Sequence, residues 1–163
     1  MAKITKFEDI ESWKRARRFT NEIYRITNAG KFSRDFVLRD QIRRAAISIL
    51  SNIAEGFERG GDNEFLQFLS VAKASCGEER AQLYIALDQE YISLPQFDSL
   101  SKATNEVSQL IAGLMKCCAT RLCAEASTAN PQTLDFWTLD FGHDLSTSRN
   151  EKHHESLSRR SRA

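Results

Sequence analysis

The clearest structural pattern in the chain lies in residues 41–56, which read QIRRAAISILSNIAEG. Apolar residues recur there every three or four positions, which is the period of one face of an α-helix. Followed upstream and downstream, the pattern predicts a helix over residues 34–57. The predicted buried stripe consists of Leu38, Ile42, Ala45, Ala46, Ile49 and Ile53. Its alanines are small, so a neighbouring helix can approach closely.

The same period predicts three further helices. One covers residues 7–28, one runs from an N-cap at Asp62 or Asn63 to about residue 91, and one runs from Pro95 to about residue 123. Glycines separate the first three, at Gly30 and at Gly60 and Gly61. No segment alternates with the period of a β-strand. Four long amphipathic helices with short connections predict an all-α fold, an antiparallel up-down-up-down four-helix bundle.

The predicted bundle spans residues 1–124, and residues 125–163 are expected to form a disordered tail. Within this tail, Leu-Asp-Phe-Trp-Thr at 134–138 is echoed by Leu-Asp-Phe-Gly-His at 139–143. The aromatic repeat is either a docking motif or a segment under little constraint, and the sequence leaves both readings open.

Composition and cysteine usage favour a cytoplasmic protein. A hydrophobic fraction of 41% and a charged fraction of 28% are ordinary for a globular chain. No apolar run reaches the roughly 18 residues that a membrane crossing needs, and no signal peptide is recognisable. The four cysteines form no CxxC pair, so reduced thiols are expected and no metal site.

Catalytic motifs are absent from the sequence. It contains no phosphate-binding loop, no dinucleotide-binding glycine pattern, no HExxH and no GxSxG. The three histidines, at 143, 153 and 154, all lie in the predicted tail, which is a poor place to position a general base. We therefore expect no enzyme activity and no cofactor.

Polar residues flank the apolar stripe of the helix predicted over 34–57. At about 100° per residue, Gln41, Ser48 and Asn52 share one flank, whereas Arg39 and Arg43 share the other. We expect this helix to contact the next one through a structural polar network, with Arg43 paired to Glu78 or Glu79. The predicted network comprises Gln41, Arg43, Ser48, Asn52, Ser75, Glu78 and Gln82.

Charge is distributed unevenly along the chain. Residues 1–60 carry 13 Lys and Arg against 8 Asp and Glu, whereas residues 61–120 carry 4 against 8. One interpretation of the basic residues is that they contact the phosphates of a nucleic acid, and such contact would be strongly salt-dependent. Against this interpretation, the pI is only about 7.7. The same residues could instead pair with another subunit or be solvated, and these alternatives remain open. The candidate nucleic-acid-binding residues are Lys14, Arg15, Arg17, Arg18, Arg39, Arg43 and Arg59.

Several short segments together resemble a known family. They are Phe-x-x-Ile-x-x-Trp at residues 7–13, QIRRAA at 41–46, NIAEG at 52–56 and EFLQFL at 64–69. In this order they resemble the bacterial four-helix-bundle proteins called 23S rRNA intervening-sequence or S23 proteins, over about residues 6–118. The chain departs from the family pattern at Glu79 and Arg80, which add charge to the third helix.

The resemblance implies a helical bundle that assembles into a homo-oligomer, a five-fold ring. It also implies a similarity to the accessory proteins of diversity-generating retroelements, which bind nucleic acid and a reverse transcriptase. We therefore expect a non-catalytic oligomer that binds RNA or DNA through a basic surface on the first helix. The alternative is a protein scaffold or adaptor whose partner is another protein and which has no nucleic-acid role.

Overall fold

The computed structural model describes residues 4–128, with side chains through residue 124, and its regular structure is entirely helical. The helices are α1 (Glu11–Thr27), α2 (Phe36–Glu58), α3 (Asp62–Asp88) and α4 (Leu94–Thr128), with 3-10 turns η1 (Phe7–Asp9) and η2 (Phe32–Arg34) before α1 and α2. Residues 4–128 contain no β-strand. The all-α prediction is confirmed.

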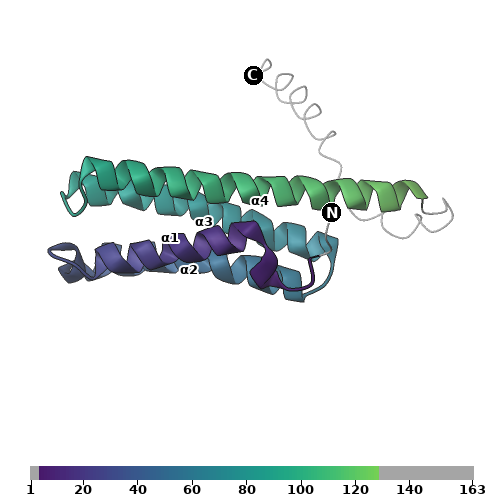
Figure 1. Cartoon of the computed structure of the whole chain (residues 1–163), viewed down its shortest axis with the longest axis horizontal. Helices are drawn as coiled ribbons and strands as arrows, with labels where there is room; N and C mark the ends of the chain where they lie inside the picture. The colour runs from purple at the N-terminus through teal and green to yellow at the C-terminus, as the bar shows by residue number, and fades with distance from the viewer. Residues whose placement is uncertain (1–3, 129–163) are drawn as a thin grey trace, which may run out of the picture. The chain divides into compact units, whose positions relative to one another are not determined.

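The four helices form an antiparallel bundle of two hairpins. Figure 1 shows α1 beside α2 in one layer and α3 beside α4 in the other. Consecutive helices run in opposite directions, because each connection between them is only a few residues long. The predicted up-down-up-down bundle is therefore confirmed.

Apolar side chains from all four helices fill the space between the layers. Every member of the stripe predicted on residues 34–57 is buried in α2, at 7% exposure or less. Ile42 and Ala46 pack with α1 and α3 toward the end of the bundle that holds the α1–α2 and α3–α4 connections. Ile49 and Ile53 pack in a second cluster, with Leu69 and Ala72 of α3. The core thus follows the helical period of the sequence.

Several predicted helix ends are shifted. The helix expected from residue 7 is a 3-10 turn followed by α1, because Ile10 is extended, with φ −70° and ψ 121°. The N-cap of α3 is Gly61, which is also extended and gives no side-chain cap. The prediction of Asp62 or Asn63 as N-cap is wrong, because both residues already lie in the first turn. At α2 the cap is conventional, since Asp35 accepts a hydrogen bond from the Leu38 amide at 3.0 Å.

The predictions for the chain beyond α4 lie outside the described residues. α4 continues to Thr128, past the boundary expected at residue 124. Residues 125–128 of the predicted tail are thus helical, whereas the rest of the tail and the aromatic repeat at 134–143 fall in the region that is not described. Within residues 4–128, no helix combines the length and the apolar character that crossing a membrane requires.

The C-terminal end of α3 carries a Schellman motif built on a residue other than glycine. Glu90 adopts φ 57°, and its amide donates to the Leu87 carbonyl at 2.9 Å. The Tyr91 amide donates to the Ala86 carbonyl at the same distance. This pair of bonds ends α3 at Asp88, three residues before the predicted end. A residue other than glycine at a left-handed position costs about 1 kcal/mol.

Glu90→Gly is therefore expected to raise the free energy of unfolding by about 0.5–1 kcal/mol, because glycine removes the left-handed strain. Urea denaturation followed by circular dichroism measures this change. Gln89→Gly is the matched control, since Gln89 has φ −84° and glycine relieves no strain there. Equal effects of the two substitutions would contradict the prediction.

Candidate nucleic-acid interface

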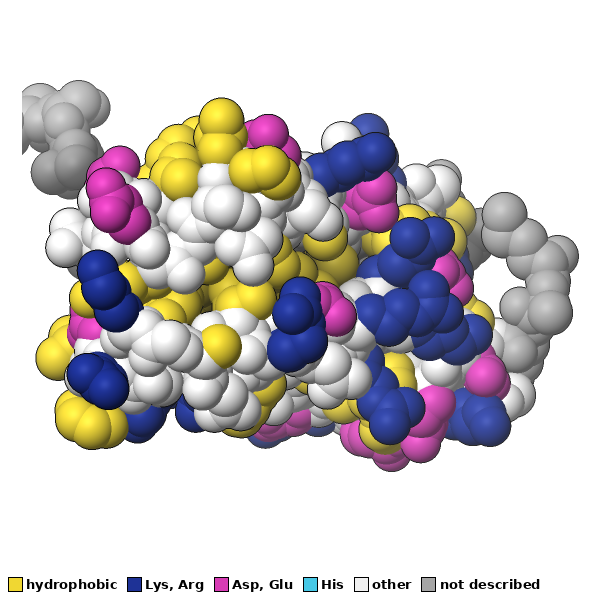
Figure 2. Space-filling model, turned by 60° about the vertical axis from the view of Figure 1, so that its left-hand side comes forward, with side chains coloured by type: hydrophobic (Ala, Val, Ile, Leu, Met, Phe, Trp, Pro, Cys, Tyr) yellow, Lys and Arg dark blue, Asp and Glu magenta, His cyan; other side chains and the backbone are white. Residues whose placement is uncertain are grey.

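The basic residues of α1 lie on its outer side. Ala16, Phe19, Thr20 and Ile23 turn one face of the helix toward the core. The basic positions at 14, 15, 17 and 18 fall between these buried ones, so that Arg15, Arg17 and Arg18 are exposed and Lys14 is half-buried. Figure 2 shows Lys and Arg side chains gathered on one part of the surface. The helical period thus concentrates positive charge within about one turn of α1.

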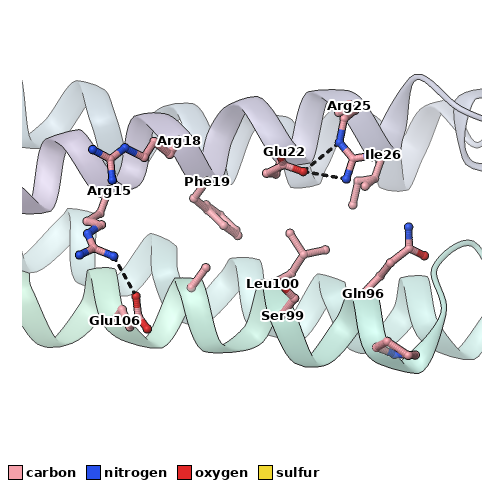
Figure 3. Close-up of a pocket in the computed structure, with 12 residues that line it drawn as sticks. Arg15, Arg18, Phe19, Glu22, Arg25, Ile26, Gln96, Ser99, Leu100 and Glu106 are labelled. Atoms are coloured by element: carbon pink, nitrogen blue, oxygen red, sulfur yellow. Dashed lines mark hydrogen bonds and ion pairs between the residues drawn. The ribbon is translucent and has the colours of Figure 1, made fainter.

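Three of these four residues have no acidic partner in the part of the chain that the structure describes. Arg15 binds Glu11 at 3.1 Å and Glu106 of α4 at 3.4 Å (Figure 3). Within the described part of the chain, no carboxylate forms an ion pair with Lys14, Arg17 or Arg18. The Arg17 guanidinium lies 5.8 Å from the centroid of the Trp13 ring, a cation–π contact that leaves its charge uncompensated. We call Lys14, Arg17 and Arg18 the helix-one basic cluster.

Two of the candidate residues on α2 and its C-terminal end are occupied by local contacts. Arg39 binds Asp40 at 2.9 Å and the Ser33 carbonyl at 3.1 Å. Arg59 binds Glu55 at 2.8 Å, and its guanidinium lies 4.8 Å from the Phe68 ring centroid. Their charges are partly neutralised, and neither belongs to the helix-one basic cluster.

Arg43 contacts α1 rather than α3. Its Nε donates to Thr27 Oγ1 and its Nη2 to Asn28 Oδ1, both at 2.8 Å. Its guanidinium lies 4.7 Å from the Tyr24 ring centroid. The predicted pairing of Arg43 with Glu78 or Glu79 is therefore wrong. The physical reason is its position on the flank of α2 that faces α1, opposite the flank that faces α3.

The flank of α2 that faces α3 carries a small hydrogen-bonded group. The hydroxyls of Ser48 and Ser75 lie 2.9 Å apart and join the two helices. Asn52 Nδ2 donates to the Ser48 carbonyl at 2.7 Å and to its hydroxyl at 3.1 Å. Ser48 and Ser75 thus connect α2 with α3, and Asn52 bonds to Ser48 within α2, on the flank expected from the spacing of Ser48 and Asn52.

The other members of the predicted network lie apart from this group. Gln82 Nε2 donates to Glu78 Oε1 at 3.0 Å, one turn away within α3. Gln41 is exposed, and the described residues give it no hydrogen-bond partner. The polar contact between α2 and α3 is thus smaller than the predicted network.

Glu79 was expected to pair with Arg43 or to add charge to α3, and its burial was not predicted. Its side chain is 0% exposed, and neither carboxylate oxygen has a hydrogen-bond partner among the described residues. Burial, with a smaller contribution from the charge of Glu78, raises the pKa of Glu79 to about 9. The signal for its burial was its place in the chain, three residues after Cys76 and four before Leu83, both of which are core residues.

Comparison with known proteins identifies the family. Residues 8–113 match the 23S rRNA-intervening sequence proteins. The chain belongs to this family. The matched region contains all of α1, α2 and α3 and the first part of α4. It also contains the QIRRAA and NIAEG segments, and the family prediction made from them is confirmed.

A solved structure shows the same fold. It is a protein of unknown function from the S23 ribosomal protein family of Bacteroides thetaiotaomicron, with 24% sequence identity and a TM-score of 0.60. The match covers 64% of this chain and 95% of that one. No curated protein matches the chain. The 23S rRNA-intervening sequence protein described here thus shares its bundle with that protein.

Proposed function

We propose that this 23S rRNA-intervening sequence protein is a non-catalytic oligomer that binds RNA or DNA through the helix-one basic cluster. The observation that supports the proposal is the presence of three basic side chains on α1 with no acidic partner in the described residues. Placing phosphates against Lys14, Arg17 and Arg18 breaks no ion pair among residues 4–124. Arg15, Arg39, Arg43 and Arg59 already make contacts with other residues, and for the exposed ion pairs of Arg15 and Arg59 an exchange of partner costs only about 0–1 kcal/mol.

Three phosphate contacts give a weak site in one subunit. The logarithm of the binding constant should fall with the logarithm of salt concentration with a slope of roughly −2 to −3 per engaged subunit. Contacts with phosphates carry no sequence information, so binding should be largely independent of sequence. Assembly of several copies would multiply the contacts and the affinity. The proposed oligomer, a five-fold ring like that implied by the family resemblance, would make such a weak site effective.

We also propose that the protein is similar to the accessory proteins of diversity-generating retroelements. It would then have a reverse transcriptase as a protein partner beside the nucleic acid. The near-neutral pI of about 7.7 is compatible with the proposal only if the basic charge is concentrated locally. The helix-one basic cluster provides such a concentration.

Charge reversal tests the proposal. The variant Lys14→Glu/Arg17→Glu/Arg18→Glu is expected to weaken binding of a short structured RNA by at least about tenfold at ~50 mM salt, because phosphate contacts dominate affinity. Fluorescence anisotropy measures binding, and light scattering checks that the mass of the particle is unchanged.

The matched control is Lys73→Glu/Lys102→Glu/Lys116→Glu, which changes the net charge equally at exposed positions on α3 and α4. It should weaken binding much less than the helix-one variant. Equal losses of RNA affinity in the two variants would show that affinity follows the net charge of the protein, and would contradict a local binding site. A wild-type particle that ignores RNA at every salt concentration would leave the protein scaffold as the function.

The scaffold alternative is favoured by one specific observation. Phe36 and Val37, at the start of α2, are 64% and 77% exposed, the two highest values among the large apolar residues of the described chain. Such a pair is typical of a surface that another protein covers. Substituting both by serine would weaken assembly or partner binding on this alternative, and would leave RNA binding per subunit unchanged on the main proposal.

A further inference from the structure

A groove with a volume of about 600 Å³ lies between α1 and α4. Figure 3 shows Phe19 of α1 and Leu100 of α4 facing each other across it. The groove exists because α4 presents Ser99 and Ala103 at this level, and their small side chains do not fill the space opposite Phe19. In Figure 2 a hollow between the layers has apolar side chains in its depth. The floor of the groove is therefore apolar, and little of it reaches solvent, since Phe19 is 3% and Leu100 7% exposed.

The rim of the groove on the α1 side carries three arginines and one glutamate, Glu22. Arg15, Arg18 and Arg25 line it, and their spacing of three and seven residues places them along one side of the helix. Arg15 is paired with Glu106 and Arg25 with Glu22, but all four side chains are 44–67% exposed. Exposed ion pairs contribute only about 0–1 kcal/mol, so these arginines can change partners at little cost. Arg18 has no acidic partner among the described residues.

An apolar floor and a basic rim together define the chemistry of the ligand. From Arg15 to Ile26 the groove follows α1 for about 16 Å, or three turns. A trough of that length between two helices accommodates a third helix, which presents apolar residues at i, i+4 and i+7. Acidic residues beside that stripe would meet the arginines. Nucleic acid fits the floor less well, since its outer surface is phosphate and sugar.

We propose that the groove between α1 and α4 binds an acidic amphipathic helix of a partner protein. The apolar stripe of that helix lies against Phe19 and Leu100, and its acidic flank lies against Arg18 and Arg25. Arg18 belongs both to the helix-one basic cluster and to the rim of the groove. The variants that test the groove are therefore placed at Ser99 and Arg25, which lie outside that cluster.

The probe is a fluorescein-labelled helical peptide of 14 residues, with leucines at i, i+4 and i+7 and glutamates on the flanks. Its counterpart carries lysines in place of the glutamates. The acidic peptide is expected to bind the full chain at least about tenfold more tightly than the lysine peptide, since rim charges set specificity. Ser99→Trp, which fills the groove, should weaken binding of the acidic peptide at least about tenfold.

Lys102→Trp is the matched control, because Lys102 is exposed on α4 outside the groove. It should leave peptide binding unchanged. A second variant, Arg25→Glu, covers the case in which Ser99→Trp does not fold. It should weaken binding of the acidic peptide and strengthen binding of the lysine peptide. Arg44→Glu, at an exposed position of α2 away from the groove, is its control.

Equal affinity for the two peptides, or unchanged affinity in both Ser99→Trp and Arg25→Glu, would overturn the proposal. RNA binding by the same variants separates it from the function proposed above. If Ser99→Trp loses peptide binding and keeps RNA binding, the groove is a protein site. If it loses RNA binding and peptide affinity is unaffected, the groove belongs to a nucleic-acid surface and the inference fails.

Discussion

Glu79→Leu is expected to raise the free energy of unfolding at pH 7 by about 3 kcal/mol. Glu79 is completely buried and has no hydrogen-bond partner in the described part of the chain. Burial raises its pKa from 4.5 to about 9, so the folded protein holds a proton at pH 7 that the unfolded chain has released. Each pH unit between 4.5 and 7 lowers the free energy of unfolding by about 1.4 kcal/mol. Leucine has a similar volume and carries no such cost.

The same argument gives the sign of the pH dependence. Between pH 4.5 and about 9 the folded state binds one more proton than the unfolded state at this group. Its contribution to stability is therefore greatest below the unfolded pKa and falls as the pH rises toward the folded pKa, by about 1.4 kcal/mol per unit. Above the folded pKa the contribution is constant.

Glu79→Gln separates the charge of this residue from its polarity. Glutamine keeps the shape and a buried polar group but does not titrate. Urea denaturation of both proteins at pH 5, 6, 7 and 8 measures the difference, in which other titrating groups cancel. The wild-type protein should lose stability relative to Glu79→Gln as the pH rises. A difference that is constant over this range would show that the carboxyl stays ionised in the fold and has found a partner there.

Much of the bundle was predictable because helical period is a local property. The stripe from Leu38 to Ile53 could be placed in the core from spacing alone, and all of it is buried. The ends of the helices were harder to predict from the sequence. The end of α3 depends on the left-handed Glu90, and no short-range sequence rule favours glutamate at such a position.

In the candidate site, the positions of the basic residues could be predicted from local sequence, but their contact partners could not. The basic residues of α1 could be placed on an outer face, but which of them lack a partner depends on residues distant in sequence. Arg15 reaches Glu106 across to α4, whereas Arg17 and Arg18 do not meet a carboxylate in the described residues. Arg43 could be placed on a flank of α2, yet the helix facing that flank is decided by the packing of the whole bundle.

Glu79 illustrates the same limit in the core. A charged residue in a helix is expected to face solvent, and Glu78 and Arg80 on either side of it do. Glu79 instead follows Cys76 and precedes Leu83 at core spacing, so the packing of the helix overrides the preference of its side chain. Residue type does not distinguish these three neighbouring charged residues, whereas the helical period indicates which one is buried.

Gly56→Ala is expected to lower the free energy of unfolding by about 2 kcal/mol, although alanine is normally the better helix residue by about 1 kcal/mol. Gly56 lies near the end of α2, where α3 approaches closely. A Cβ atom there would lie 2.6 Å from Phe68 Cβ and 3.0 Å from Phe65 Cδ2. Phe68 Cβ is attached directly to the backbone, so no rotamer change removes the overlap and α3 must move.

The control for Gly56→Ala is Gly113→Ala in α4, where an added Cβ meets no described atom within 4 Å. That substitution should raise stability by about 1 kcal/mol, because only helix propensity changes. Urea denaturation of the two variants therefore should give changes of opposite sign. If Gly56→Ala is also stabilising, α2 and α3 can separate at this level without loss of packing. The glycine of the NIAEG segment would then have to be explained by something other than the close contact of these helices.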